Sequence, residues 1–199
     1  MKYILASTSP RRQELFKQVT SEFDIIPSFA DENLSLYFST EKIKKALDEE
    51  PEILVKKLAQ IKAEEVARHV ENGIVVGSDT GVFFEKQMLG KPKDALDAVK
   101  MLKELSGKSH KVITGVCVVK VENFKTVKTD IEFDETEVVF NTLSDELIEK
   151  YVASKLCFGK AGGYGIQDGY PLVEKYVGSY ENVMGFPIEL VGKMIKNIE

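Results

Sequence analysis

Residues 5–16, with the sequence LASTSPRRQELF, carry the first group of side chains that could bind a ligand. The hydroxyls of Ser7 and Ser9 are hydrogen-bond donors, and the proline that follows favours the first turn of a helix. A helix N-terminus presents unpaired N–H groups and about half a positive charge, so it attracts anions. Arg11 and Arg12 add two cations at this positive end, which predicts a polyanion site. The alternative is that both arginines are solvated or pair with nearby acids.

The segment GSDTG, residues 77–81, carries an acid that could act in catalysis. Asp79 comes after the apolar run IVV, so we expect a buried strand that breaks at residues 77–81 and places Asp79 at its carboxyl end. Ligand-binding and catalytic groups of α/β sheets gather at that edge. A carboxylate there can hold Mg²⁺ or activate water. The alternative is a turn in which Asp79 bonds its own backbone.

Three lysines and one further acid complete the candidates. Lys62, Lys91 and Lys160 are each flanked by glycine or alanine, and the last two lie in glycine-containing segments, where a backbone can approach a ligand closely. Glu32 follows the end of an expected strand and could be a second metal carboxylate. Taken singly, each of these four could equally be a surface charge.

The elements that must position these residues alternate between strand and helix patterns, which predicts an α/β domain. We expect one domain over residues 1–199. The expected strands cover 2–6, 23–28, 72–85 with the break, and a long hairpin of 111–121 and 126–140 around Asn123. Two of the expected helices begin at Pro10 and Pro51, and four others cover 40–50, 94–105, 145–154 and 182–197. A glycine-rich loop is expected over 159–171.

Composition excludes several classes of protein. The chain has 199 residues, 43% of them hydrophobic, and a net charge of -5, which argues against a general nucleic-acid binder. Its two cysteines match no paired metal spacing and are expected to be reduced. The apolar run at the N-terminus is too short for a signal or membrane segment. We therefore expect a cytoplasmic protein with no membrane partner.

Several segments, in this order along nearly the whole chain, resemble the Maf family of nucleoside triphosphate pyrophosphatases, the septum-formation Maf proteins. The matching segments are LASTSPRRQEL, DE at 31–32, LAQIKAEEVA, VVGSDTGV, LGKP, LSGKSHKVITGV, LSDELIEKYV, KAGGYGIQ and GSYENVMGFP. The resemblance implies an elongated α/β fold, like that of the inosine triphosphate pyrophosphatases. A central mixed sheet is flanked by helices, and a cleft lies between two lobes.

The resemblance also implies an activity. Family members cleave a nucleotide between its α and β phosphates with the help of a divalent cation, Mg²⁺ or Mn²⁺, and this chain is similar to the dTTP/UTP subgroup through Arg11, Thr80 and Gln167. It implies that Asp79 is the catalytic base. Our hypothesis is that Glu32 and Asp79 hold the metal. The expected substrate-binding residues are Ser7, Ser9, Arg11, Arg12, Lys62, Thr80, Lys91, Lys160 and Gln167. A homodimer is a further expectation from the family.

Three alternatives stay open at the level of sequence. The chain could catalyse the same reaction on CTP or a modified nucleotide, or it could be a plain phosphatase that releases orthophosphate. It could also be a nucleotide-binding regulator of septation without turnover. Assays of pyrophosphate release over a panel of triphosphates separate the three.

Overall fold

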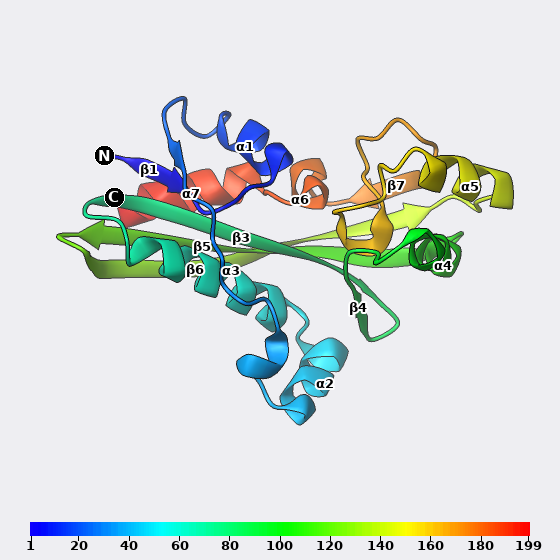
Figure 1. Cartoon of the computed structure of the whole chain (residues 1–199), viewed down its shortest axis with the longest axis horizontal. Helices are drawn as coiled ribbons and strands as arrows, with labels where there is room; N and C mark the ends of the chain where they lie inside the picture. Colours follow the sequence, from blue (N-terminus) through cyan, green and yellow to red (C-terminus); the bar gives the residue numbers. More distant parts are fainter.

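The computed structural model describes residues 1–199 and has a seven-stranded mixed sheet at its centre (Figure 1). The strands run in the order β2-β1-β3-β5-β6-β7, and β4 pairs with β3 beside this path. Only β1 makes parallel pairs, with β2 and β3; all other neighbours are antiparallel. The strands are β1 (Tyr3–Leu5), β2 (Asp24–Ile25), β3 (Gly73–Phe84), β4 (Gln87–Leu89), β5 (Ser109–Glu122), β6 (Lys125–Phe140) and β7 (Val173–Val177).

The predicted hairpin is confirmed and forms the long axis of the sheet (Figure 1). Asn123 and Phe124, the two residues between β5 and β6, have φ angles of 52° and 59°. Two consecutive positive φ angles are typical of the tight turn whose twist matches that of the flanking strands. β3, β5 and β6 therefore extend as one antiparallel platform on which the helices lie.

Helices cover both faces of this platform (Figure 1). On one face, α1 and α7 pack their apolar sides against β1, β3 and β5 around Phe16 and Phe186, which are fully buried. On the opposite face, α3 packs against β3 and β5 through small side chains such as Ala59 and Ala63. The helices are α1 (Pro10–Phe16), α2 (Thr40–Glu49), α3 (Glu52–Ala67), α4 (Ala95–Leu105), α5 (Asp145–Ala153), α6 (Tyr180–Met184) and α7 (Ile188–Ile198), with short 3₁₀ turns η1 (Leu34–Leu36) and η2 (Ala161–Gly163).

A second apolar cluster lies at the other end of the sheet. There α4, α5 and the glycine-rich loop pack around the ends of β3, β5 and β6, with Leu102, Phe140 and Tyr151 fully buried. This end forms one lobe, and the end with β1, α1, α3 and α7 forms the other (Figure 1). The α/β fold with a mixed sheet and two lobes is as expected from the sequence.

Two glycines let α3 lie unusually close to the sheet. A Cβ atom at Gly77 would lie 2.7 Å from the carbonyl oxygen of Ala59, and one at Gly115 would lie 2.5 Å from the carbonyl oxygen of Val55. Real Cβ atoms do not approach backbone this closely, so any larger residue would push the helix away. The close packing brings Lys62 of α3 next to Asp79 in the middle of β3.

Two expectations about the elements were wrong. β3 does not break at residues 77–81 but continues unbroken from Gly73 to Phe84, because β5 pairs with every residue from Gly73 to Phe83. The C-terminal segment is not one helix over 182–197. It forms α6 and α7, separated at Gly185, which has a φ of 102° and ends α6 in the left-handed conformation. None of the helices combines the length and apolar character needed to cross a bilayer.

Candidate active site

A cavity of about 350 Å³ lies at an open stretch of the edge of β3. On this edge β1 pairs with β3 as far as Val76, and β4 pairs with it from Val82 onwards. The residues between have a neighbouring strand only on the β5 side. Side chains from both faces of the sheet therefore reach the same space, including Asp79 from one face and Thr80 from the other. The expected break at residues 77–81 is therefore wrong for a physical reason. β3 continues through these residues, and it is the neighbouring strand β1 that ends.

An ion cluster occupies one side of the cavity. The Nζ atom of Lys62 on α3 lies 2.6 Å from Oδ1 of Asp79 and 2.8 Å from Oε1 of Glu32. The side chains of Lys62 and Asp79 are each 11% exposed, and that of Glu32 is 51% exposed. Partial burial raises the pKa of Glu32, but the hydrogen bond and charge of Lys62 outweigh it, and the net shift is downward. The tertiary structure thus joins three of the residues that the sequence singled out.

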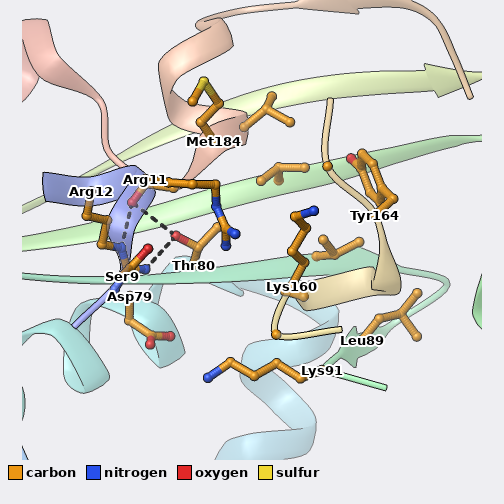
Figure 2. Close-up of a pocket in the computed structure, with 18 of the residues that line it drawn as sticks. Ser9, Arg11, Arg12, Asp79, Thr80, Leu89, Lys91, Lys160, Tyr164 and Met184 are labelled. Carbon is orange, nitrogen blue, oxygen red and sulfur yellow. Dashed lines mark hydrogen bonds between the residues drawn. The ribbon is translucent and has the colours of Figure 1, made fainter. Parts of the chain in front are cut away.

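Arg12 connects three separate segments at the edge of the cavity. Its Nη1 donates to the carbonyl oxygen of Ser78 at 2.8 Å and its Nε to the carbonyl oxygen of Gly185 at 3.0 Å. Its Nη2 donates to Oγ1 of Thr80 at 3.1 Å (Figure 2). Burial lowers its pKa from the ordinary arginine value, against the opposing charge of Asp79. The guanidinium therefore fixes α1 to β3 and to the end of α6. A further contact from Arg12 to a substrate stays a prediction.

Arg11 and Lys91 are the cations that reach the cavity without a protein acceptor. Both line it together with Ser9, and Figure 2 shows their side chains extending into the same space as Asp79. Ser9 precedes α1 as expected, but its side chain makes no capping hydrogen bond. Its hydroxyl, the Arg11 guanidinium and the Lys91 ammonium are consequently available to a bound anion.

A second hollow of about 360 Å³ adjoins the cavity and shares the cation side with it. Ser7 lines this hollow and not the main cavity. Its Oγ accepts a hydrogen bond from the backbone N–H of Ser9 at 3.2 Å. Its buried hydroxyl thus supports the turn before α1, and a role in substrate binding stays a prediction for Ser7.

The glycine-rich loop forms the far wall, and a buried ion pair holds it closed. Lys160 Nζ lies 2.6 Å from Oδ2 of Asp168 and donates to the carbonyl oxygen of Leu156 at 2.6 Å. The hydroxyl of Tyr151 on α5 donates to the same carboxylate oxygen at 2.6 Å and accepts from the N–H of Gly165 at 3.1 Å. Lys160 lines the cavity as expected, but its ammonium group is engaged by the loop itself. Gln167, beside this pair, lines the cavity and makes no side-chain hydrogen bond within the protein.

The rest of the cavity is largely apolar. Thr80 lies between this part and Asp79 (Figure 2). The apolar lining comes from β3, β4, β5, α6 and the glycine-rich loop: Val82, Leu89, Val112, Tyr164, Val183 and Met184. One cavity thus combines a polar, mostly cationic side with an apolar side.

Sequence reasoning missed the residues that support these walls. Nε2 of His110 lies 2.7 Å from the hydroxyl of Tyr164, and burial lowers the pKa of His110 to about 4. Asp168 was not among the expected site residues, although it lies inside the glycine-rich segment 159–171. An acid within such a loop is the only hint that the sequence offers. The sequence gives no signal for His110, because no second histidine lies near it.

The donor set of the ion cluster fits a metal held jointly with a substrate. No group of three or more histidine, cysteine, aspartate or glutamate side chains is arranged to hold a metal ion. Mg²⁺ usually binds through one or two carboxylates, with waters and substrate phosphates completing its shell. Glu32 and Asp79 supply two carboxylates on one wall of the cavity, next to the free cations. Two carboxylates fit a Mg²⁺ ion that is held together with a substrate, and they are too few for a structural metal site made of protein ligands alone.

Comparison with known proteins gives one family and one fold. The family model described as "Maf-like protein" matches residues 2–198. A dTTP/UTP pyrophosphatase of Thermosipho africanus is 46% identical over 193 residues, which is 96% of this chain and 90% of that protein. One of Ruminiclostridium cellulolyticum is 41% identical over 196 residues, 98% of this chain and 95% of that protein. The solved structure of the Staphylococcus aureus Ham1 protein covers both chains completely with a TM-score of 0.50 and 13% identity, a likeness in fold alone.

Proposed function

The chain belongs to the Maf-like protein family, and from this we propose that it hydrolyses nucleoside triphosphates, dTTP and UTP above all, to the monophosphate and pyrophosphate. The observation that carries this proposal is the cavity at the open edge of β3. It combines a buried carboxylate–lysine pair, two uncommitted cations and an apolar wall. The relatives' names supply the reaction, and the cavity supplies groups suited to each part of such a substrate.

The polar side suits the triphosphate. Arg11 and Lys91 have no protein acceptor, so their charges can meet phosphate oxygens, and Ser9 adds a hydroxyl. The N-terminus of α1 faces the adjoining hollow, which gives the phosphates a second source of N–H donors. Lys62 is already paired with two carboxylates, so we assign it to holding them rather than to binding phosphate directly.

Asp79 is the residue that we assign to activating water. Its Oδ1 is held by Lys62, and its Oδ2 accepts no hydrogen bond from the protein. Oδ2 can therefore orient a water molecule and accept its proton as the water oxygen attacks phosphorus, while the pyrophosphate leaves in line. The arrangement asks for little covalent chemistry from the protein, because position and charge neutralisation do most of the work.

A divalent cation, Mg²⁺ or Mn²⁺, would supply additional neutralisation of phosphate charge when bound, and Glu32 and Asp79 are the residues that would hold it. The net downward shift in the pKa of Glu32 keeps this carboxylate ionised over the physiological range, as such a role requires. Without a substrate, Lys62 balances the two negative charges. Metal binding and substrate binding are then coupled through the same pair of acids.

The apolar side suits the base, with Thr80 and Gln167 as its polar contacts. A site built around hydrogen bonds to a base discriminates well, because a wrong base leaves buried polar groups unpaired. Gln167 has both a donor and an acceptor free. We further propose that the protein acts in the cytoplasm, since both of its cysteines are free and buried. The homodimer stays a prediction.

The test is a panel of nucleoside triphosphates with separate detection of pyrophosphate and orthophosphate, with and without a chelator. We expect pyrophosphate from dTTP and UTP that depends on added metal. Orthophosphate as the first product would identify a phosphatase instead. Tight binding of nucleotide without release of pyrophosphate or orthophosphate would identify a regulator. Preferred turnover of CTP or a modified nucleotide would assign a different substrate preference to the enzyme.

A further inference from the structure

The hydroxyl of Thr80 is part of a chain of hydrogen bonds that runs beneath the cavity. Its oxygen accepts from Nη2 of Arg12 at 3.1 Å and lies 3.0 Å from the hydroxyl oxygen of Thr114 on β5. Thr114 is completely buried, and its hydroxyl donates to the backbone carbonyl oxygen of Asn182 at 3.1 Å. Thr80 lines the cavity, whereas Thr114 does not.

The positions of the hydroxyl protons follow from counting donors. Each threonine hydroxyl has one proton and two lone pairs. The proton of Thr114 is used on the carbonyl oxygen of Asn182, so the contact between the two threonines is made by the proton of Thr80, for which the carbonyl oxygen of Gly185 at 3.4 Å is a second, more distant acceptor. This direction satisfies all three contacts of 3.1 Å or shorter, and hydrogen bonds aligned in one direction reinforce one another. Thr80 is thereby left without a proton for a ligand and offers only its remaining lone pair.

We infer that Thr114 is a specificity-determining positioning residue, which fixes the hydroxyl of Thr80 as a hydrogen-bond acceptor and so selects bases that donate at that point. The inference rests on the proposed function, since it assumes a pyrimidine in the apolar part of the cavity. Uracil and thymine carry an N–H at ring position 3, whereas cytosine has an unprotonated nitrogen there. An acceptor at Thr80 can accept a hydrogen bond from the N–H of uracil or thymine. With cytosine it faces the lone pair of the unprotonated nitrogen and cannot form this bond.

The surroundings of Thr114 agree with a fixed rather than an adjustable hydroxyl. Asn182, whose carbonyl accepts from Thr114, is itself completely buried and anchored by its amide nitrogen to Val112 and Thr136 at 3.0 Å each. The same carbonyl also accepts from the N–H of Gly185 at 2.9 Å. Thr114 is therefore held against a part of α6 that is fixed from two further directions.

The experiment compares Thr114→Val with Thr114→Ser. Valine removes the nearer acceptor of the Thr80 proton at nearly constant volume and leaves only the carbonyl oxygen of Gly185 at 3.4 Å, so this proton can turn towards a ligand. We expect the ratio of kcat/KM for UTP over CTP to fall about tenfold in the valine variant, mostly through improved use of CTP. Serine keeps the hydroxyl, so its ratio should stay within about twofold of the parent protein. A folded valine variant with an unchanged ratio overturns the inference.

Two further measurements keep the result decisive. Binding of non-hydrolysable UTP and CTP analogues measures the preference for UTP over CTP without turnover. If the protein releases no pyrophosphate, the proposed reaction is refuted, but the comparison of binding can still be made. Thermal melting checks that Thr114→Val folds. If it does not, Thr114→Cys, whose thiol is only a weak acceptor, takes its place, and its ratio should fall in the same direction. Equal binding ratios in all folded variants contradict the inference.

Discussion

Lys62 and Asp79 form an almost buried ion pair, with Nζ and Oδ1 2.6 Å apart, although they belong to a helix and a strand on opposite sides of a close-packed interface. The pair forms because Gly77 admits the backbone of α3 to within contact distance of β3. Its position at the open edge of the strand gives the acid access to the cavity. The catalytic assignment of Asp79 depends on this relationship.

Asp79→Asn is expected to abolish most turnover and to preserve nucleotide binding. The amide keeps the shape and can still accept from Lys62, but it cannot take a proton from water, and loss of a general base costs typically 10²- to 10⁴-fold in rate. Pyrophosphate release and calorimetric nucleotide binding measure the two effects. Asp31→Asn is the matched control, since Asp31 is exposed and does not line the cavity. Near-normal turnover in Asp79→Asn would remove the proposed base.

The adjacent arginines are expected to fail in different ways. Arg11→Gln should raise the KM for the triphosphate by about tenfold or more and leave the melting temperature nearly unchanged, because Arg11 makes no hydrogen bond to the protein. Arg12→Gln should lower the free energy of unfolding by about 3 kcal/mol, since three hydrogen bonds to a charged group are lost. Kinetics and denaturant unfolding of both variants test the split. Equal loss of stability in the two would contradict it.

Asp168→Asn is expected to destabilise the protein strongly, because it leaves the charge of Lys160 buried without its partner. The two side chains are 6% and 9% exposed, and breaking such a pair costs about 3–5 kcal/mol. Asp24→Asn is the control: it breaks the exposed ion pair with Lys2, which should change stability by less than about 1 kcal/mol. Urea unfolding measures both. A comparable small effect at the two sites would show that the loop does not depend on this pair.

The stability of the protein is expected to fall between pH 6.5 and pH 4 through His110. Burial lowers the pKa of His110 to about 4 from 6.5, so over this range the unfolded chain binds a proton that the folded chain excludes. The contribution of the neutral His110 to the free energy of unfolding is complete above pH 6.5, and about 2 kcal/mol of stability is lost by pH 5. His110→Gln should flatten this part of the pH profile in urea unfolding, whereas His69→Gln, at an exposed position, should not. An unaltered profile in His110→Gln would assign the acid sensitivity elsewhere.

Much of the fold could be predicted from local patterns. The hairpin around Asn123 and the helices expected over 94–105 and 145–154 are confirmed. The turn of the hairpin and the caps that the structure shows at Asp94 and Ser144 act over only a few residues, so local sequence is enough to indicate these elements. The break at residues 77–81 was wrong, since whether glycines interrupt a strand depends on its partner, and β5 is distant in sequence. The prediction of a single C-terminal helix was wrong, because Gly185 adopts a left-handed conformation that ends α6. The carbonyl oxygen of Gly185 also accepts a hydrogen bond from Arg12.

For the site, the sequence by itself determined which residue types were present: the two arginines, the lysines, Glu32, Asp79 and the glycine-rich loop. Only the tertiary structure decided what each one does. Lys62 holds carboxylates, Lys160 closes its own loop and Arg12 fixes three segments, whereas Arg11 and Lys91 stay free for a ligand. The physical reason is that a side chain's role is set by its partners, and these partners come from elements tens of residues away that meet only when the sheet and its helices have packed.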